Sequence, residues 1–230
     1  MANGLQGKPP HESAACPNRD AHEAPFPGRG VDLRARYFFY DLFLSMTVSE
    51  PTDEAVAAWR RGLEAVRIAE PESAFGRSAE QLVRLLDAED AGARVRSEFN
   101  RIFCDPVGRT VSLLASSYVD GRPFGRYLVR LRTFLEDTPF EKEEGYAETE
   151  DSLPFHLDLM RCFIREELAA SSPAERKKWQ GFQKEFLLAY LAAWIPDCIA
   201  ELTQREAEPF YREAAALMAV FFREEQAACG

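Results

Sequence analysis

From residue 31 onward, apolar residues recur every three or four positions along almost the whole chain. That spacing is typical of helices that bury one face. Alternating apolar and polar residues, which would indicate strands, do not occur over any length. The pattern predicts eight helical stretches, which cover residues 31–47, 50–68, 78–90, 91–103, 124–137, 152–170, 172–206 and 208–226. The predicted fold class is therefore all-α, a bundle of about eight helices.

Several of these stretches begin with residues that cap helix N-termini. Thr52 carries a side-chain oxygen that can accept a hydrogen bond from the first free N–H groups of a helix. Ser78 has Gln81 three residues later, which is the spacing of a capping box. Ser172 precedes Pro173, an arrangement favoured at a helix start. Each of these positions is predicted to open a helix.

Two irregular segments interrupt the helical pattern. Residues 104–123 contain two prolines, two glycines and three serines, and loops of that length in a compact domain are uncommon and often functional. Residues 136–151 carry eight acidic residues against a single lysine. We interpret residues 137–150 as an acidic hinge linker. It would join an N-terminal helical half, residues 31–136, to a C-terminal helical half, residues 151–230.

Composition narrows the possible roles of the chain. Residues 1–30 are rich in proline, glycine, alanine and polar residues, and we expect a disordered tail there because so little apolar surface could be buried. The net charge of −10 argues against a nucleic-acid partner. Five cysteines without a C-x-x-C pair fit neither a disulfide framework nor a zinc site, and they suit a cytoplasmic location. The apolar runs are too short for stable membrane insertion.

Catalytic motifs are absent from the sequence. It contains no phosphate-binding loop, no dinucleotide-binding glycine pattern and no nucleophile elbow. His156 is the one histidine beyond residue 31, and no nucleophile lies in register with it, so we interpret it as a structural histidine that is partly exposed or hydrogen-bonded. The expected protein is therefore not an enzyme and holds neither a metal nor a cofactor.

A proline and a tryptophan interrupt the longest helical stretch, where the sequence reads Trp194-Ile195-Pro196. Proline inside a helix removes one hydrogen bond and clashes with the preceding turn, at a cost of about 3 kcal/mol. One explanation is a kink that directs Trp194 and Tyr190 towards a shared pocket. The other is that one helix ends near Ile195 and a second begins at Pro196. The sequence alone leaves both open.

Three segments together resemble the TorD/DmsD/NarJ-like family of chaperones, which mature molybdenum-containing redox enzymes. The segment at 97–121 resembles the family's E-[YF]-x-x-[LI]-F-x-x-P … S-x-Y signature, the segment at 148–160 its acidic central block, and the segment from 186 its closing W-x-P … F-Y block. The matching residues are Glu98, Phe99, Ile102, Phe103, Pro106, Ser117, Tyr118, Glu148, Asp151, Leu153, Leu157, Met160, Phe186, Leu191, Trp194, Pro196, Phe210 and Tyr211.

The chain departs from the family pattern at three positions. Ser152 stands where the family has a histidine after Asp151, and His156 stands where it has a glutamate. Tyr190 replaces the histidine that precedes W-x-P. The resemblance is therefore to a divergent member, and the identity of its client enzyme does not carry over.

The resemblance implies an all-helical chaperone whose groove binds the twin-arginine signal peptide of a client. It would hold the apo form of a molybdenum-containing oxidoreductase subunit until the molybdopterin is inserted, and so delay export. Acidic residues would meet the paired arginines, and aromatic residues would line a trough for the apolar part. The residues expected to bind the peptide are Phe103, Pro106, Ser117, Tyr118, Glu148, Asp151, Ser152, Tyr190, Trp194 and Pro196.

Two other classes of function stay open on the sequence. One is a helical adaptor or regulator that binds a folded partner protein, and the other is a helical sensor that binds a small molecule. The expected assembly is a monomer, or a dimer that exchanges its halves across the hinge.

Overall fold

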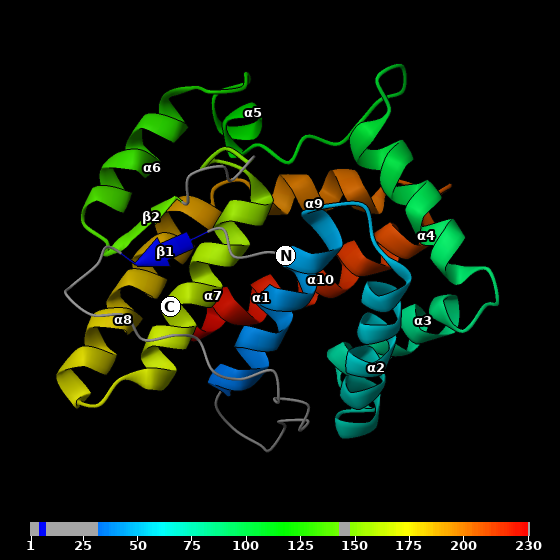
Figure 1. The fold of residues 1–230 in the computed structure, drawn as a ribbon, viewed down its shortest axis with the longest axis horizontal. Coiled ribbons are helices and arrows are strands. Elements are labelled where there is room, and N and C mark those ends of the chain that lie inside the picture. The colour runs from blue at the N-terminus through cyan, green and yellow to red at the C-terminus, as the bar shows by residue number, and fades with distance from the viewer. Residues whose placement is uncertain (1–4, 8–31, 143–147, 230) are drawn as a thin grey trace.

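The computed structural model describes residues 5–7, 32–142 and 148–229 (Figure 1). Within these ranges the chain is almost entirely helical, which confirms the all-α prediction. The elements are β1 (Leu5–Gly7), α1 (Leu33–Thr47), α2 (Asp53–Ala69), α3 (Ala74–Leu86), α4 (Ala91–Phe99), the π-helix η1 (Asn100–Cys104), α5 (Ala115–Val119), α6 (Arg126–Glu136), β2 (Phe140–Lys142), α7 (Leu153–Ala169), α8 (Pro173–Phe186), the π-helix η2 (Leu187–Leu191), α9 (Ile195–Thr203) and α10 (Pro209–Cys229).

The helix starts agree with the sequence at two of the three predicted caps. The Thr52 hydroxyl oxygen accepts a hydrogen bond from Ala55 N, and Ser172 accepts one from Glu175 N. The prediction that a capping box at Ser78 opens a helix is wrong, because α3 begins at Ala74, four residues earlier. There the Ser73 hydroxyl oxygen accepts a hydrogen bond from Gly76 N at 3.0 Å, which satisfies one of the first free N–H groups.

A two-stranded antiparallel sheet was not expected from the sequence. Strand β1 pairs with β2 so that Gly7 lies opposite Phe140. The two strands fall inside the predicted tail and the predicted acidic linker. Residues 1–4 and 8–30 of the tail and 143–147 of the linker lie outside the described residues, so the acidic hinge stays a prediction. Phe140 is buried against Phe163 of α7, which fixes the start of the linker to the core.

The two sequence halves interlock in space. Helix α1 packs along α7, and the last helix, α10, packs against α3 and α4 as well as α9. Figure 1 shows α1 and α10 crossing in the middle of the molecule, with α2 and α3 on one side and α8 on the other. One continuous aromatic and aliphatic core therefore runs through both halves.

A buried polar network joins four of these helices. The Arg36 guanidinium on α1 donates to both carboxylate oxygens of Glu225 on α10, at 2.6 and 2.8 Å, and to Gln183 on α8 at 2.7 Å. The Tyr40 hydroxyl donates to Glu225 at 2.9 Å, and Gln183 donates on to Glu167 of α7. Burial would disfavour the guanidinium charge, but the carboxylate of Glu225 outweighs it, so the pKa of Arg36 is raised.

Candidate functional site

The break in the long C-terminal stretch follows the second of the two explanations. Helix α8 continues as the π-helix η2 and ends at Leu191, and α9 begins at Ile195 after a bend of 58°. Pro196 lies in the first turn of α9, where its missing N–H group breaks no helical hydrogen bond. No single described helix is long and apolar enough to cross a membrane, although this bent pair passes by length and composition together.

Trp194 sits at the bend, and its side chain is fully buried. Its ring stacks on Tyr118 with a centroid separation of 5.7 Å and lies 5.5 Å from the imidazole of His156. Tyr190 is only partly buried and packs instead against Tyr127 and the neighbouring phenylalanines. Packed rings of Tyr127 and His156 therefore fill the space between Trp194 and Tyr190.

Asp151 ties the long loop to the start of α7. The carboxylate is fully buried and accepts hydrogen bonds from the hydroxyls of Ser116 and Thr149. The backbone oxygen of Asp151 accepts a hydrogen bond from Ala115 N at 2.8 Å, and Leu153 N donates to Leu113 O at 2.7 Å. Two segments that the sequence analysis matched separately to the family thus form one hydrogen-bonded unit.

Tyr118 connects this unit to α9 and to the surface. Its hydroxyl lies within hydrogen-bond distance of the Ser112 carbonyl, at 2.9 Å, and of the Glu201 carboxylate, at 3.0 Å. Burial raises the pKa of this hydroxyl, so it stays protonated and acts as a donor. The Ser117 hydroxyl accepts a hydrogen bond from the Ser112 hydroxyl. We call the cluster made by Ser116, Tyr118, Tyr127, Asp151, His156 and Trp194 the Trp194 junction.

The remaining predicted site residues lie outside this cluster or at its edge. Ser152 is buried and caps α7 by accepting a hydrogen bond from Phe155 N. Glu148 is partly buried, and that burial raises the pKa of its carboxyl group. Phe103 packs on Phe99 and Tyr211 beside α10, and Pro106 is exposed in the loop that follows. The structure therefore does not bring these last two residues to the junction.

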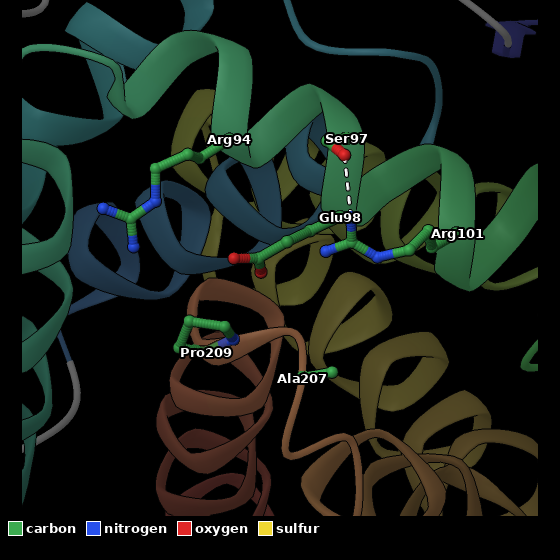
Figure 2. Close-up of a pocket in the computed structure, with 6 residues that line it drawn as sticks. All are labelled: Arg94, Ser97, Glu98, Arg101, Ala207 and Pro209. Carbon is green, nitrogen blue, oxygen red and sulfur yellow. Dashed lines mark hydrogen bonds between the residues drawn. The ribbon is translucent and has the colours of Figure 1, made fainter.

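A second place where family-like segments meet is the contact between α4 and the start of α10. The Glu98 carboxylate accepts hydrogen bonds from Phe210 N and Tyr211 N, at 2.9 and 3.2 Å, and so caps α10 from a distant helix. A shallow hollow of about 250 Å³ opens beside it (Figure 2), lined by Arg94, Ser97, Glu98, Arg101, Ala207 and Pro209. Arg101 donates to Ser97 and Glu208, so the groups in contact here already satisfy one another, and we assign this place a structural role.

His156 is a residue of the junction that the sequence analysis took for an ordinary structural histidine, partly exposed or hydrogen-bonded. It is fully buried, its Nε2 atom lies 3.4 Å from the Tyr127 hydroxyl, and its Nδ1 atom has no hydrogen-bond partner. The indole Nε1 of Trp194 has none either. An unpaired polar group in the interior costs about 1–3 kcal/mol, so this junction is packed but not fully satisfied.

Burial of His156 should make the protein sensitive to acid. Desolvation lowers the pKa of the imidazole to about 3, whereas the unfolded chain has a pKa near 6.5. The unfolded state therefore binds more protons below pH 6.5, and stability falls as the pH falls. We expect His156 alone to remove about 2 kcal/mol of unfolding free energy between pH 7 and pH 5. Urea unfolding of the wild type and His156→Leu at both pH values measures this. An equal loss in both proteins would contradict it.

The chain is similar in sequence to known proteins. Residues 69–200, more than half of the chain, match the family described as nitrate reductase delta subunit. The chaperone protein TorD of Aeromonas salmonicida (strain A449) is 27% identical over 198 residues, which cover 83% of this chain and 88% of the relative. A crystal structure of a redox enzyme maturation protein from Archaeoglobus fulgidus covers 71% of this chain and 98% of its own, at 13% identity and a TM-score of 0.38, and no conclusion rests on it. The chain therefore belongs to the nitrate reductase delta subunit family, the TorD/NarJ-like group of redox-enzyme maturation chaperones, and is not an enzyme.

Proposed function

We propose that this chain is a cytoplasmic chaperone that binds the twin-arginine leader, the apo form, or both, of a molybdopterin-dependent oxidoreductase subunit. By holding the client it would assist cofactor insertion and delay export. Family membership supports the chaperone role. The leader, the cofactor and the cytoplasmic location are parts of the proposal, and binding of the leader is the part that a direct titration can test.

The observation that carries the proposal is that two buried nitrogen atoms at the Trp194 junction have no hydrogen-bond partner. Trp194 Nε1 and His156 Nδ1 are both buried without a hydrogen-bond partner, at the point where three family-like segments pack together. The π-helix η2 and the bend after it adjoin the same place, and such turns occur often at functional sites. A peptide carbonyl of a bound leader could accept a hydrogen bond from the Trp194 indole N–H.

The proposed mode of binding is an opening of the junction at its partly exposed edge. Tyr118 and Tyr190 reach the surface, whereas Trp194 and Asp151 do not, so a leader would first contact the tyrosines. Glu201 lies at the Tyr118 hydroxyl, and Glu148 lies before the buried Asp151. These carboxylates could meet the leader's arginines, while displacement of Tyr118 from the Trp194 ring would admit its apolar part.

The test is a titration with a synthetic, fluorescein-labelled twin-arginine leader. Tyr118→Ala should weaken binding by about tenfold, because a partly buried aromatic anchor supplies much of the affinity. Tyr37→Ala is the matched control, since Tyr37 is also partly buried but lies on α1 beneath Arg161. We expect it to leave the affinity unchanged. Binding should also weaken with added salt, because exposed charges are screened within about 8–10 Å.

A second readout reports whether the junction opens. With 5-fluorotryptophan in place of tryptophan, the ¹⁹F resonance of Trp194, assigned through Trp194→Phe, should shift when the leader binds. A leader whose two arginines are glutamines should produce no shift. The proposal fails if the leader binds without moving that resonance, or if the glutamine leader binds equally well.

A further inference from the structure

Three exposed arginines and two exposed apolar side chains gather on the start of α6 and the turn before it. Phe124 is 62% exposed and Val129 is 65% exposed, which are among the largest values for apolar residues in the described chain. Arg126, Val129 and Arg130 are spaced three and four positions apart, so they are neighbours on one side of the helix. We call Arg122, Phe124, Arg126, Val129 and Arg130 the α6 face, and Figure 1 shows α6 at the edge of the molecule.

The turn that presents Phe124 is held from inside the protein. Phe124 has a φ of 58°, a left-handed conformation that is unfavourable for a bulky residue. Its N–H group donates to the Ser116 hydroxyl oxygen at 2.8 Å, and Ser116 in turn donates to the buried Asp151. On the other side of the turn, Tyr127 N donates to the Asp120 carboxylate. The buried network therefore keeps an aromatic ring in solvent.

The charge on this face is opposite to that of the whole chain. The net charge is −10, yet none of Arg122, Arg126 and Arg130 forms an ion pair within the described ranges, whereas Arg132 further along α6 is paired with Glu150. Unpaired guanidinium groups around apolar side chains favour a ligand that has carboxylates around apolar groups. Arg130 adjoins the leader site proposed above, because its carbonyl accepts a hydrogen bond from the Tyr190 hydroxyl and its guanidinium lies 5.9 Å from the centroid of the Tyr127 ring. A cationic twin-arginine leader is repelled by the three arginines, so we treat the face as a second surface that borders the leader site.

We infer that the α6 face is a docking surface for an acidic, apolar segment of a partner protein. Phe124 and Val129 would make the apolar contact, and the three arginines would hold the carboxylates on either side of it. A membrane or a nucleic acid also offers negative charge. Both are extended polyanions, so the acidic remainder of this chain would repel them. A short acidic segment feels only the charges within about 8–10 Å of it, and on this face those are the three arginines.

The probe is a fluorescein-labelled helical peptide with a leucine stripe and glutamates on its other positions. Its lysine-for-glutamate counterpart is the charge control. We expect the wild type to bind the glutamate peptide at least about tenfold more tightly than the lysine peptide. Triple substitution of Arg122, Arg126 and Arg130 to Glu should remove that preference. Phe124→Gly should weaken binding by about tenfold and retain the fold, because glycine tolerates a positive φ.

The matched variant reverses three exposed charges elsewhere, Arg176, Lys177 and Lys184 of α8, and changes the net charge equally. It should leave the preference intact. Equal binding of both peptides by the wild type, or equal loss in the two triple variants, overturns the inference. So does tighter binding to anionic phosphatidylglycerol vesicles or to a DNA duplex than to the peptide. Leader affinity measured on the same α6 variants should not fall, and a fall would show that the two surfaces are one.

Discussion

Replacing Arg36 with methionine should lower the free energy of unfolding by about 3–5 kcal/mol, because the variant leaves the Glu225 carboxylate buried without its counter-ion. The side chains of Arg36 and Glu225 are 13% and 2% exposed, so water cannot replace the lost partner. The same residue links α1 to α10 and α8. Urea unfolding at pH 7, followed by circular dichroism, measures the change.

The control removes both charges. Arg36→Met/Glu225→Met should recover at least about half of the loss, because the penalty comes from the unpaired charge and only in part from lost packing. Tyr40 and Gln183 lose hydrogen bonds in this double variant, so full recovery is not expected. If the double variant is less stable than Arg36→Met alone, the network stabilises the fold by a different mechanism.

Truncation of Trp194 to alanine is expected to lower the free energy of unfolding by about 3–5 kcal/mol, because a large cavity forms in a fully buried position. Trp194→Phe should have a much smaller effect, about 1 kcal/mol or less. The phenyl ring keeps most of the contact with Tyr118 and His156, and the substitution removes an indole N–H that has no partner. Thermal and urea unfolding both report these differences.

Trp59 provides the comparison for this pair of variants. Its indole is also buried, but its Nε1 atom donates to the Ser45 hydroxyl at 2.7 Å. Trp59→Phe therefore loses a satisfied hydrogen bond and should be more destabilising than Trp194→Phe. Equal losses at the two positions would mean that the Trp194 N–H group finds a partner in solution.

Helix content was readable from the sequence because local signals decide it. Periodic apolar residues and the caps at Thr52 and Ser172 identify helices without knowledge of their neighbours. The prediction at Ser78 failed because the capping-box spacing also occurs inside a helix. Ser73 supplies the cap instead. The break at Pro196 stayed ambiguous because the same residues fit a kink or a new helix start.

The burial of the candidate site could not be read from the sequence. Asp151 is of a residue type that is usually exposed. Its burial depends on hydrogen bonds from the neighbouring Thr149 and from the distant Ser116, and only the fold brings Ser116 to it. Likewise, nothing in the neighbourhood of His156 along the chain shows that Tyr127 and Trp194 enclose it. The sequence grouped residues of three segments as one expected site. The structure brings Tyr118, Asp151 and Trp194 of that group together but not Phe103 and Pro106, because the contacts that decide their positions are long-range.

The position of α10 bears on how the protein is made. Its Phe210 stacks on Trp59 of α2, and its Phe221 packs on Phe39 of α1. The core of the first half of the chain is thus completed by a helix that is synthesised after all the other described helices. Until α10 has left the ribosome, the nascent chain exposes aromatic surface that α10 later covers, and such exposed surface favours aggregation.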